Sequence, residues 1–187
     1  IELSGASAGA TYRVLDLLFA EGLAAKGRRG WIESTDWQRL LRRWAADWVA
    51  TERRFTLRFA LPDGIESAVS RLAREPVDSC LLGGAHAAAQ FMGGGDAKHL
   101  LVHSEGAAAL SRRLDAAPAG DADEGELTIH ARSLAVAAAR SGITRKLAIA
   151  SPSQAYADLV LAGDDKAAGK LLKAMSKRPA EWRAIAA

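Results

Sequence analysis

Residues 77–92 read Val-Asp-Ser-Cys-Leu-Leu-Gly-Gly-Ala-His-Ala-Ala-Ala-Gln-Phe-Met. Residues 77–82 of this stretch predict a buried strand, because short apolar runs bounded by turn residues are typical of strands covered on both faces. Gly83-Gly84 predicts a tight turn, and the alanine-rich residues behind it predict a helix that ends near Met92. A buried strand that turns directly into a helix indicates an α/β fold.

The same alternation continues on both sides of this unit. Strands are predicted at 55–59, 99–103, 126–130 and 146–149, and helices at 65–72, 105–114, 153–162, 164–176 and 179–187. The acidic stretch 116–125 is expected to be a loop. We therefore expect class α/β (α+β), with a mixed sheet covered by helices over residues 53–187.

The first fifty residues follow a different pattern. A helix is predicted over 7–22, capped by Ser7 and stopped by Gly22 in a left-handed conformation. Two short strands around the turn at 26–30 come next. A long amphipathic helix is predicted over 35–50; the spacing of Trp37, Trp44 and Trp48 places them on its apolar face, which favours core packing over base stacking.

The order of these N-terminal elements is typical of a DNA-binding module. The predicted helix carries small and polar residues at its start and apolar residues later, as a recognition helix does when its first turns reach base edges. A basic turn follows and could hold flanking phosphates. The candidate DNA-binding residues are Ser7, Thr11, Tyr12, Arg13, Lys26, Arg28 and Arg29. A surface helix with a solvated hairpin is the alternative.

Charge is distributed unevenly along the chain. Residues 1–58 hold ten basic and seven acidic side chains, and the rest of the chain holds fifteen of each. The whole net charge of +3 therefore lies in the N-terminal third. This asymmetry favours a polyanionic partner for that third.

Taken together, these segments resemble the AbiEi-type antitoxins, the winged helix-turn-helix regulators of type IV toxin–antitoxin systems. The resemblance rests on the helix after Ser7, on residues 37–45, on Leu81-Leu-Gly-Gly-Ala-His-Ala-Ala88, and on residues 152–163. It divides the chain into a partial winged helix-turn-helix (1–33), a bridging helix (34–52) and a degenerate nucleotidyltransferase-like domain (53–187). It implies a repressor of its own operon that binds inverted repeats in double-stranded operator DNA.

The resemblance also implies a cognate nucleotidyltransferase-like toxin. It leaves two roles open for the α/β domain, which are contact with that toxin and formation of a homodimer. Two other interpretations remain open. One is an active nucleotidyltransferase, and the other is a protein-interaction domain that does not bind DNA.

The sequence argues against catalysis. A nucleotidyltransferase needs paired carboxylates after the glycine turn to hold divalent metal, and this chain offers His103, Ser104 and Glu105 there. The histidine spacing does not indicate a metal site, so neither metal nor cofactor is expected. Gly83-Gly84 could bind a phosphate, but such a pair more often permits close packing. Ser151, Ser153, Tyr156 and Asp158 form no evident nucleophile–base set.

Composition bounds the location of the protein. No apolar run approaches the ~20 residues of a membrane span, and the single Cys80 fits a reducing compartment, so a cytoplasmic protein is expected. Cys80 itself is expected to be an inert core thiol. The chain begins at Ile1 rather than Met, so we expect that further residues precede it, including the helix before the recognition helix, of which only Ile1 to Leu3 could remain.

Overall fold

Residues 7–28 and 31–35 form a small N-terminal unit in the computed structural model, which describes residues 7–28, 31–52, 56–75, 79–95, 97–120, 126–131, 142–144 and 147–177. Helix α1 (Ala8–Ala20) begins where the Ser7 hydroxyl accepts a hydrogen bond from the backbone N–H of Ala10. It is followed by Gly22, whose φ of 64° is the left-handed conformation predicted for it.

A two-stranded antiparallel ribbon follows α1. Strand β1 (Ala24–Lys26) pairs with β2 (Ile32–Thr35), as the glycine-flanked basic turn predicts. Strand β2 continues two residues past the boundary expected at residue 33, so the ribbon leads directly into helix α2 (Trp37–Glu52). The carboxylate of Asp36 accepts a hydrogen bond from the backbone N–H of Arg39 and caps that helix.

The rest of the described chain builds a seven-stranded mixed sheet in the order β6-β3-β7-β5-β4-β9-β8. The two parallel contacts are β5 with β7 and β4 with β9, and the other neighbours are antiparallel. The strands are β3 (Thr56–Ala60), β4 (Leu81–Leu82), β5 (Leu100–Ser104), β6 (Ala117–Pro118), β7 (Leu127–Ala131), β8 (Gly142–Thr144) and β9 (Leu147–Ile149). This arrangement confirms the mixed α/β class.

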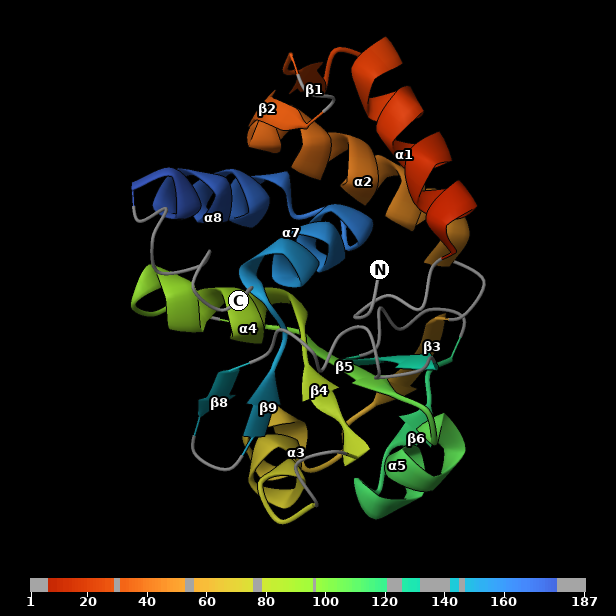
Figure 1. Ribbon diagram of the computed structural model, residues 1–187. Helices are drawn as coiled ribbons and strands as arrows, with labels where there is room; N and C mark the ends of the chain where they lie inside the picture. Colours follow the sequence, from red (N-terminus) through yellow and green to blue (C-terminus); the bar gives the residue numbers. More distant parts are fainter. Residues whose placement is uncertain are drawn as a thin grey trace.

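Helices cover this sheet on both sides (Figure 1). Helices α4 and α7 lie on one side with α2 and α8 outside them, and α3 and α5 lie toward the other side. Their bounds are α3 (Gly64–Leu72), α4 (Gly84–Met92), α5 (Ala107–Arg113), α7 (Pro152–Leu161) and α8 (Asp165–Lys177). The helix predicted over 179–187 lies outside the described residues.

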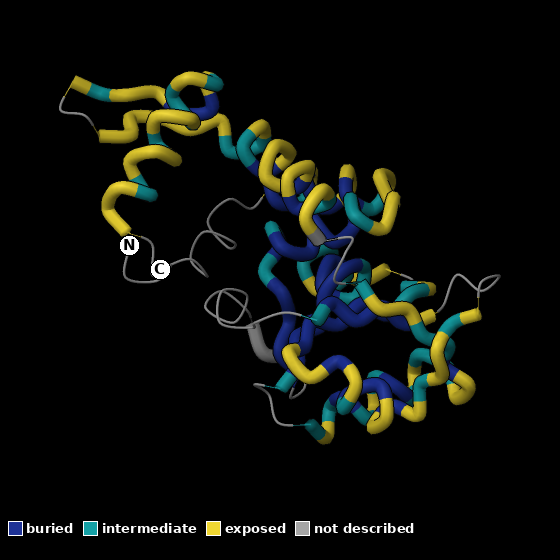
Figure 2. The backbone as a smooth tube through the Cα atoms, turned by 90° about the vertical axis from the view of Figure 1, so that its right-hand side faces the viewer, coloured by how far each residue is buried: buried dark blue, intermediate teal, exposed yellow. Residues whose placement is uncertain are grey.

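Burial separates the sheet from the N-terminal unit. All five residues of β5 are buried, which is typical of a central strand covered on both faces. Helix α1, in contrast, has no buried residue. Figure 2 shows the consequence: buried residues gather in the α/β body, and the N-terminal unit is exposed along most of its length. The main core therefore belongs to the α/β body.

Candidate functional site

The start of α1 is held by two hydroxyl groups. The Ser7 hydroxyl accepts from the Ala10 N–H at 3.2 Å, and the Thr11 hydroxyl donates to the Ser7 carbonyl at 3.1 Å. Both predicted site residues therefore hold the first turn in shape. A recognition helix needs such a fixed first turn, because its register against a partner depends on it.

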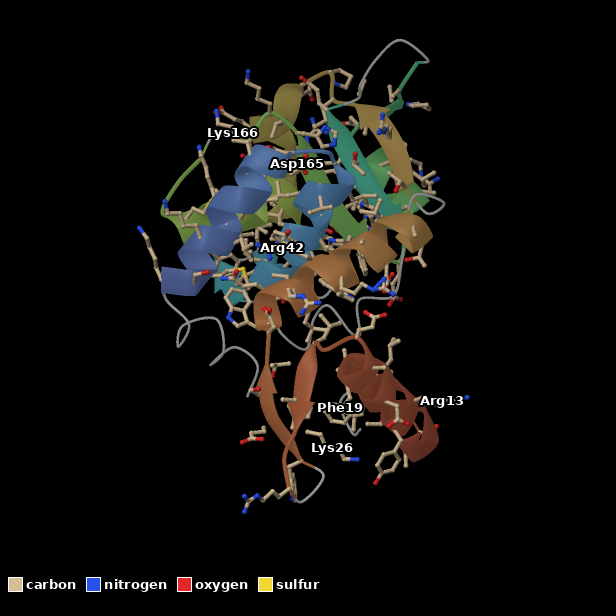
Figure 3. The ribbon with its side chains drawn as sticks, turned by 90° about the horizontal axis from the view of Figure 1, so that it is seen from above. Arg13, Phe19, Lys26, Arg42, Asp165 and Lys166 are labelled. Atoms are coloured by element: carbon tan, nitrogen blue, oxygen red, sulfur yellow. The ribbon has the colours of Figure 1, made fainter. Side chains whose placement is uncertain are left out.

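Two of the predicted site residues project outward from this turn. Tyr12 is 68% exposed, and Arg13 is also exposed. Figure 3 shows Arg13 extending from α1 into open space, away from the body of the molecule. Thr11 is only partly exposed. The structure therefore leaves Tyr12 and Arg13 exposed near the start of α1.

The β1–β2 ribbon lies beside α1. The backbone N–H of Gly27 donates to the carbonyl of Trp31 at 2.8 Å and narrows the ribbon near its tip, where Arg28 is exposed. The ammonium of Lys26 lies 5.9 Å from the centre of the Phe19 ring, a cation–π contact that directs it toward α1 (Figure 3). Arg29 lies outside the described residues.

Arginines of α2 attach this unit to the body. The guanidinium of Arg43 pairs with Glu21 at 3.3 Å and with Asp47 at 3.2 Å, and Arg39 donates to the carbonyl of Gly22 at 3.5 Å. These contacts hold the C-terminal end of α1, which is the end remote from Tyr12 and Arg13. Attachment at this end leaves the first turns of the helix uncovered.

A second polar cluster lies at the glycine turn of the body and is fully buried. The Asp158 carboxylate, from α7, accepts from the N–H of Gly84 at 3.0 Å and lies 2.9 Å from His103 Nε2. Its other oxygen accepts from the Gln154 side chain at 2.8 Å. Asp158 and His103 are both 0% exposed. Gly83 makes room for this arrangement, since a Cβ there would lie 2.4 Å from the Asp158 carboxylate.

The electrostatics of this cluster favour an ionised Asp158. Burial raises the pKa of that carboxyl. The electrostatic interaction with His103 and the hydrogen bonds from His103, Gln154 and the Gly84 N–H outweigh burial, so the pKa lies below its ordinary value. Because it accepts from the Gly84 N–H, this negatively charged carboxylate lies at the N-terminus of α4, and helix N-termini bind anions. The chain therefore supplies its own anion at this helix start.

Two further aromatic side chains surround His103. Its ring stacks on that of His130 with centroids 5.3 Å apart. The ring of Trp48, from α2, packs against it edge to face with centroids 6.5 Å apart. The two histidines are register partners on the parallel strands β5 and β7. The spacing of the histidines along the sequence was interpreted for metal binding and did not predict this packing. Their matching positions at the ends of two predicted strands were the available signal.

The other candidates of the sequence differ from this cluster in exposure or in local role. Glu105 is exposed, and across the described ranges no group of three His, Cys, Asp or Glu side chains is placed to hold a metal ion. Ser151 caps α7 by accepting from the Gln154 N–H, as expected. Burial raises the pKa of the Cys80 thiol, which keeps it protonated at neutral pH.

Comparison of the chain with family models, with curated proteins and with solved structures yields no match. Within the described residues, no helix is both long enough and apolar enough to cross a membrane. The candidate site is therefore defined by its own geometry, which is an exposed helix start beside a basic ribbon.

Proposed function

We propose that this chain is a non-enzymatic transcriptional regulator that binds double-stranded DNA through α1 and the β1–β2 ribbon. In the form suggested by its resemblance, it is a cytoplasmic antitoxin repressor that binds inverted repeats in the operator of its own type IV toxin–antitoxin operon. Helix α1 takes the part of the recognition helix, and the ribbon takes the part of the wing. The α/β body then serves in dimerisation or toxin contact.

The observation that carries this proposal is the shared direction of α1 and the ribbon. Both project from the same side of the body in Figure 3, where Arg13 marks the helix and Lys26 marks the ribbon. The exposed Arg28 follows Lys26 by two residues, in the turn of the ribbon. A helix can enter the major groove and read base edges, while a basic ribbon beside it contacts phosphates. The exposed phenol of Tyr12 adds a hydrogen-bonding group at the same helix start.

The buried cluster supports a regulator over a nucleotidyltransferase. The Asp158 carboxylate already accepts from the Gly84 N–H, so that N–H is not available to a triphosphate. An incoming phosphate would also meet the negative charge of Asp158 with no water to screen it. The glycine turn then serves close packing of α4 against β5 and α7.

A mobility-shift titration tests the proposal with the DNA that lies upstream of the gene for this chain. We expect Arg28→Ala to weaken binding about tenfold on every duplex and to reduce the salt slope by about 1, as the loss of one phosphate contact would. We expect Arg13→Ala to lose about 1–3 kcal/mol of discrimination between that DNA and a scrambled duplex.

The matched control is Arg112→Ala, which removes one exposed charge from α5, remote from α1 in Figure 1. Its affinity for DNA should equal that of the unmodified chain. If Arg112→Ala and Arg28→Ala lose the same affinity for DNA, the loss would reflect only the change in net charge. That result would refute the role of the ribbon. Binding that does not weaken as salt rises would refute the proposal as a whole.

A further inference from the structure

A groove of about 650 Å³ lies between α4 and α8, on the α/β body rather than on the N-terminal unit. Its apolar side is formed by Phe91 and Met92 of α4, both only partly buried, together with alanines of the two helices. Apolar side chains left partly open in a concave surface are typical of a binding groove.

Four lysines border the groove from one helix. Lys166, Lys170, Lys173 and Lys177 follow one another at steps of four, three and four residues, so they share one face of α8 over about 16 Å of helix. All four are exposed, and in the described part of the chain none takes part in an ion pair. The opposite face of α8 is buried in the core.

The positive charge increases toward the C-terminal end of α8. Asp164 and Asp165 stand at the start of the helix, and the Asp164 carboxylate accepts from the Ala167 N–H as a cap. Lys166 lies beside these acids, at the end of α8 remote from the β1–β2 ribbon (Figure 3). The uncompensated charge of the groove therefore comes from Lys170, Lys173 and Lys177.

We infer that this groove binds an acidic amphipathic helix of a protein partner. An amphipathic helix docks by placing its apolar residues into a groove at a spacing of three and four residues. Here its apolar residues would cover Phe91 and Met92, and its carboxylates would pair with the lysines at the same spacing. A nucleic-acid backbone would use the lysines but gain nothing from the apolar side. The inference does not depend on DNA binding by α1.

Fluorescence anisotropy with the full chain tests this inference. The probe is a labelled peptide of Leu and Glu, about 15 residues long, with leucines at helical spacing. Two comparison probes are a scrambled peptide of the same composition and a mixed-sequence DNA duplex. We expect saturable binding of the amphipathic peptide, weaker binding of the scrambled one, and about a tenfold loss of affinity in Lys170→Glu/Lys173→Glu.

The matched control is Lys98→Glu, at an exposed position outside the groove. Its affinity for the peptide should stay within about twofold of the unmodified chain. Thermal unfolding of each variant checks that the fold is retained. The shape of the groove is tested separately by Ala174→Gln. The larger side chain narrows the groove without changing its charge, so this variant should also bind the peptide more weakly.

Three results would overturn the inference. The first is equal affinity for the amphipathic and scrambled peptides, which would show charge attraction without a groove. The second is absence of peptide binding. The third is duplex binding that Lys170→Glu/Lys173→Glu abolishes while Arg28→Ala leaves it intact, which would assign the lysines to nucleic acid.

Discussion

At the scale of single residues, Asp158 is tightly constrained by burial and hydrogen bonding. Its carboxylate is fully buried and receives hydrogen bonds from Gly84 and Gln154 beside His103. We expect Asp158→Asn to lower the free energy of unfolding by about 3 kcal/mol, because it breaks a buried charged network without removing volume. Urea denaturation at neutral pH measures this loss. Asp16→Asn, at an exposed position of α1, should change stability little.

The same carboxylate makes stability depend on pH. Its pKa in the folded chain lies below its ordinary value, which is about 3.9 in an unfolded chain. The charged form therefore stabilises the fold above about pH 4, and this contribution is lost as pH falls through the lower, folded pKa. Between neutral pH and about pH 3, stability should fall less in Asp158→Asn than in the unmodified chain. Parallel pH profiles for the two chains would contradict this assignment.

At the scale of elements, the turn between β4 and α4 depends on the absence of a side chain at Gly83. A Cβ there would lie 2.4 Å from Asp158 Oδ2, 2.6 Å from Leu101 Cδ2 and 2.8 Å from His103 Nε2, all in buried side chains, so the turn or these side chains would have to shift. We expect Gly83→Ala to destabilise the chain by about 3 kcal/mol, measured by thermal or urea unfolding.

Gly169→Ala is the matched control for that change. Gly169 lies inside α8, and a Cβ added there would meet nothing within 4 Å, so alanine should stabilise the helix by about 1 kcal/mol. If Gly83→Ala destabilises the chain while Gly169→Ala stabilises it, the requirement for glycine is specific to the turn between β4 and α4. Equal, small effects would show that α4 can shift away from Asp158.

Most elements of this chain follow from local signals in the sequence. Ser7 and Ser151 cap the helices predicted behind them, and Gly22 adopts the left-handed conformation predicted for it. Strand β6 lies in the stretch 116–125, where a loop was predicted, and strand β8 was not predicted, because pairs and triplets of residues carry no period. They become strands through pairing with β3 and β9.

The buried cluster could not be predicted for a related reason. Asp158, His103 and His130 come from α7, β5 and β7, and only the folded sheet brings them together. Along the sequence, Asp158 is one polar residue among several on a helix. The exposed candidates Tyr12, Arg13 and Arg28 were predictable, because one helix and one turn carry them.

At the scale of the whole molecule, stability is divided unequally between the body and the N-terminal unit. Every residue of β5 is buried, whereas α1 has none buried and exposes Val14 and Leu17 at 55% and 50%. Local opening costs little where few apolar contacts are lost. The amides of α1 should therefore exchange with deuterium at least about 100-fold faster than those of β5, as mass spectrometry of peptic fragments would measure.

Binding of DNA should change that pattern in one place. If α1 enters a groove, the duplex stabilises the helix by mass action, and its amides become protected in proportion to occupancy. Helix α5, remote from α1 in Figure 1, serves as the internal control and should exchange at an unchanged rate. Protection of α1 equal to that of β5 without DNA would contradict the unequal division of stability. Protection spread evenly over α1 and α5 on addition of duplex would contradict a DNA contact through α1, because a localised contact slows local opening chiefly in the element that it covers.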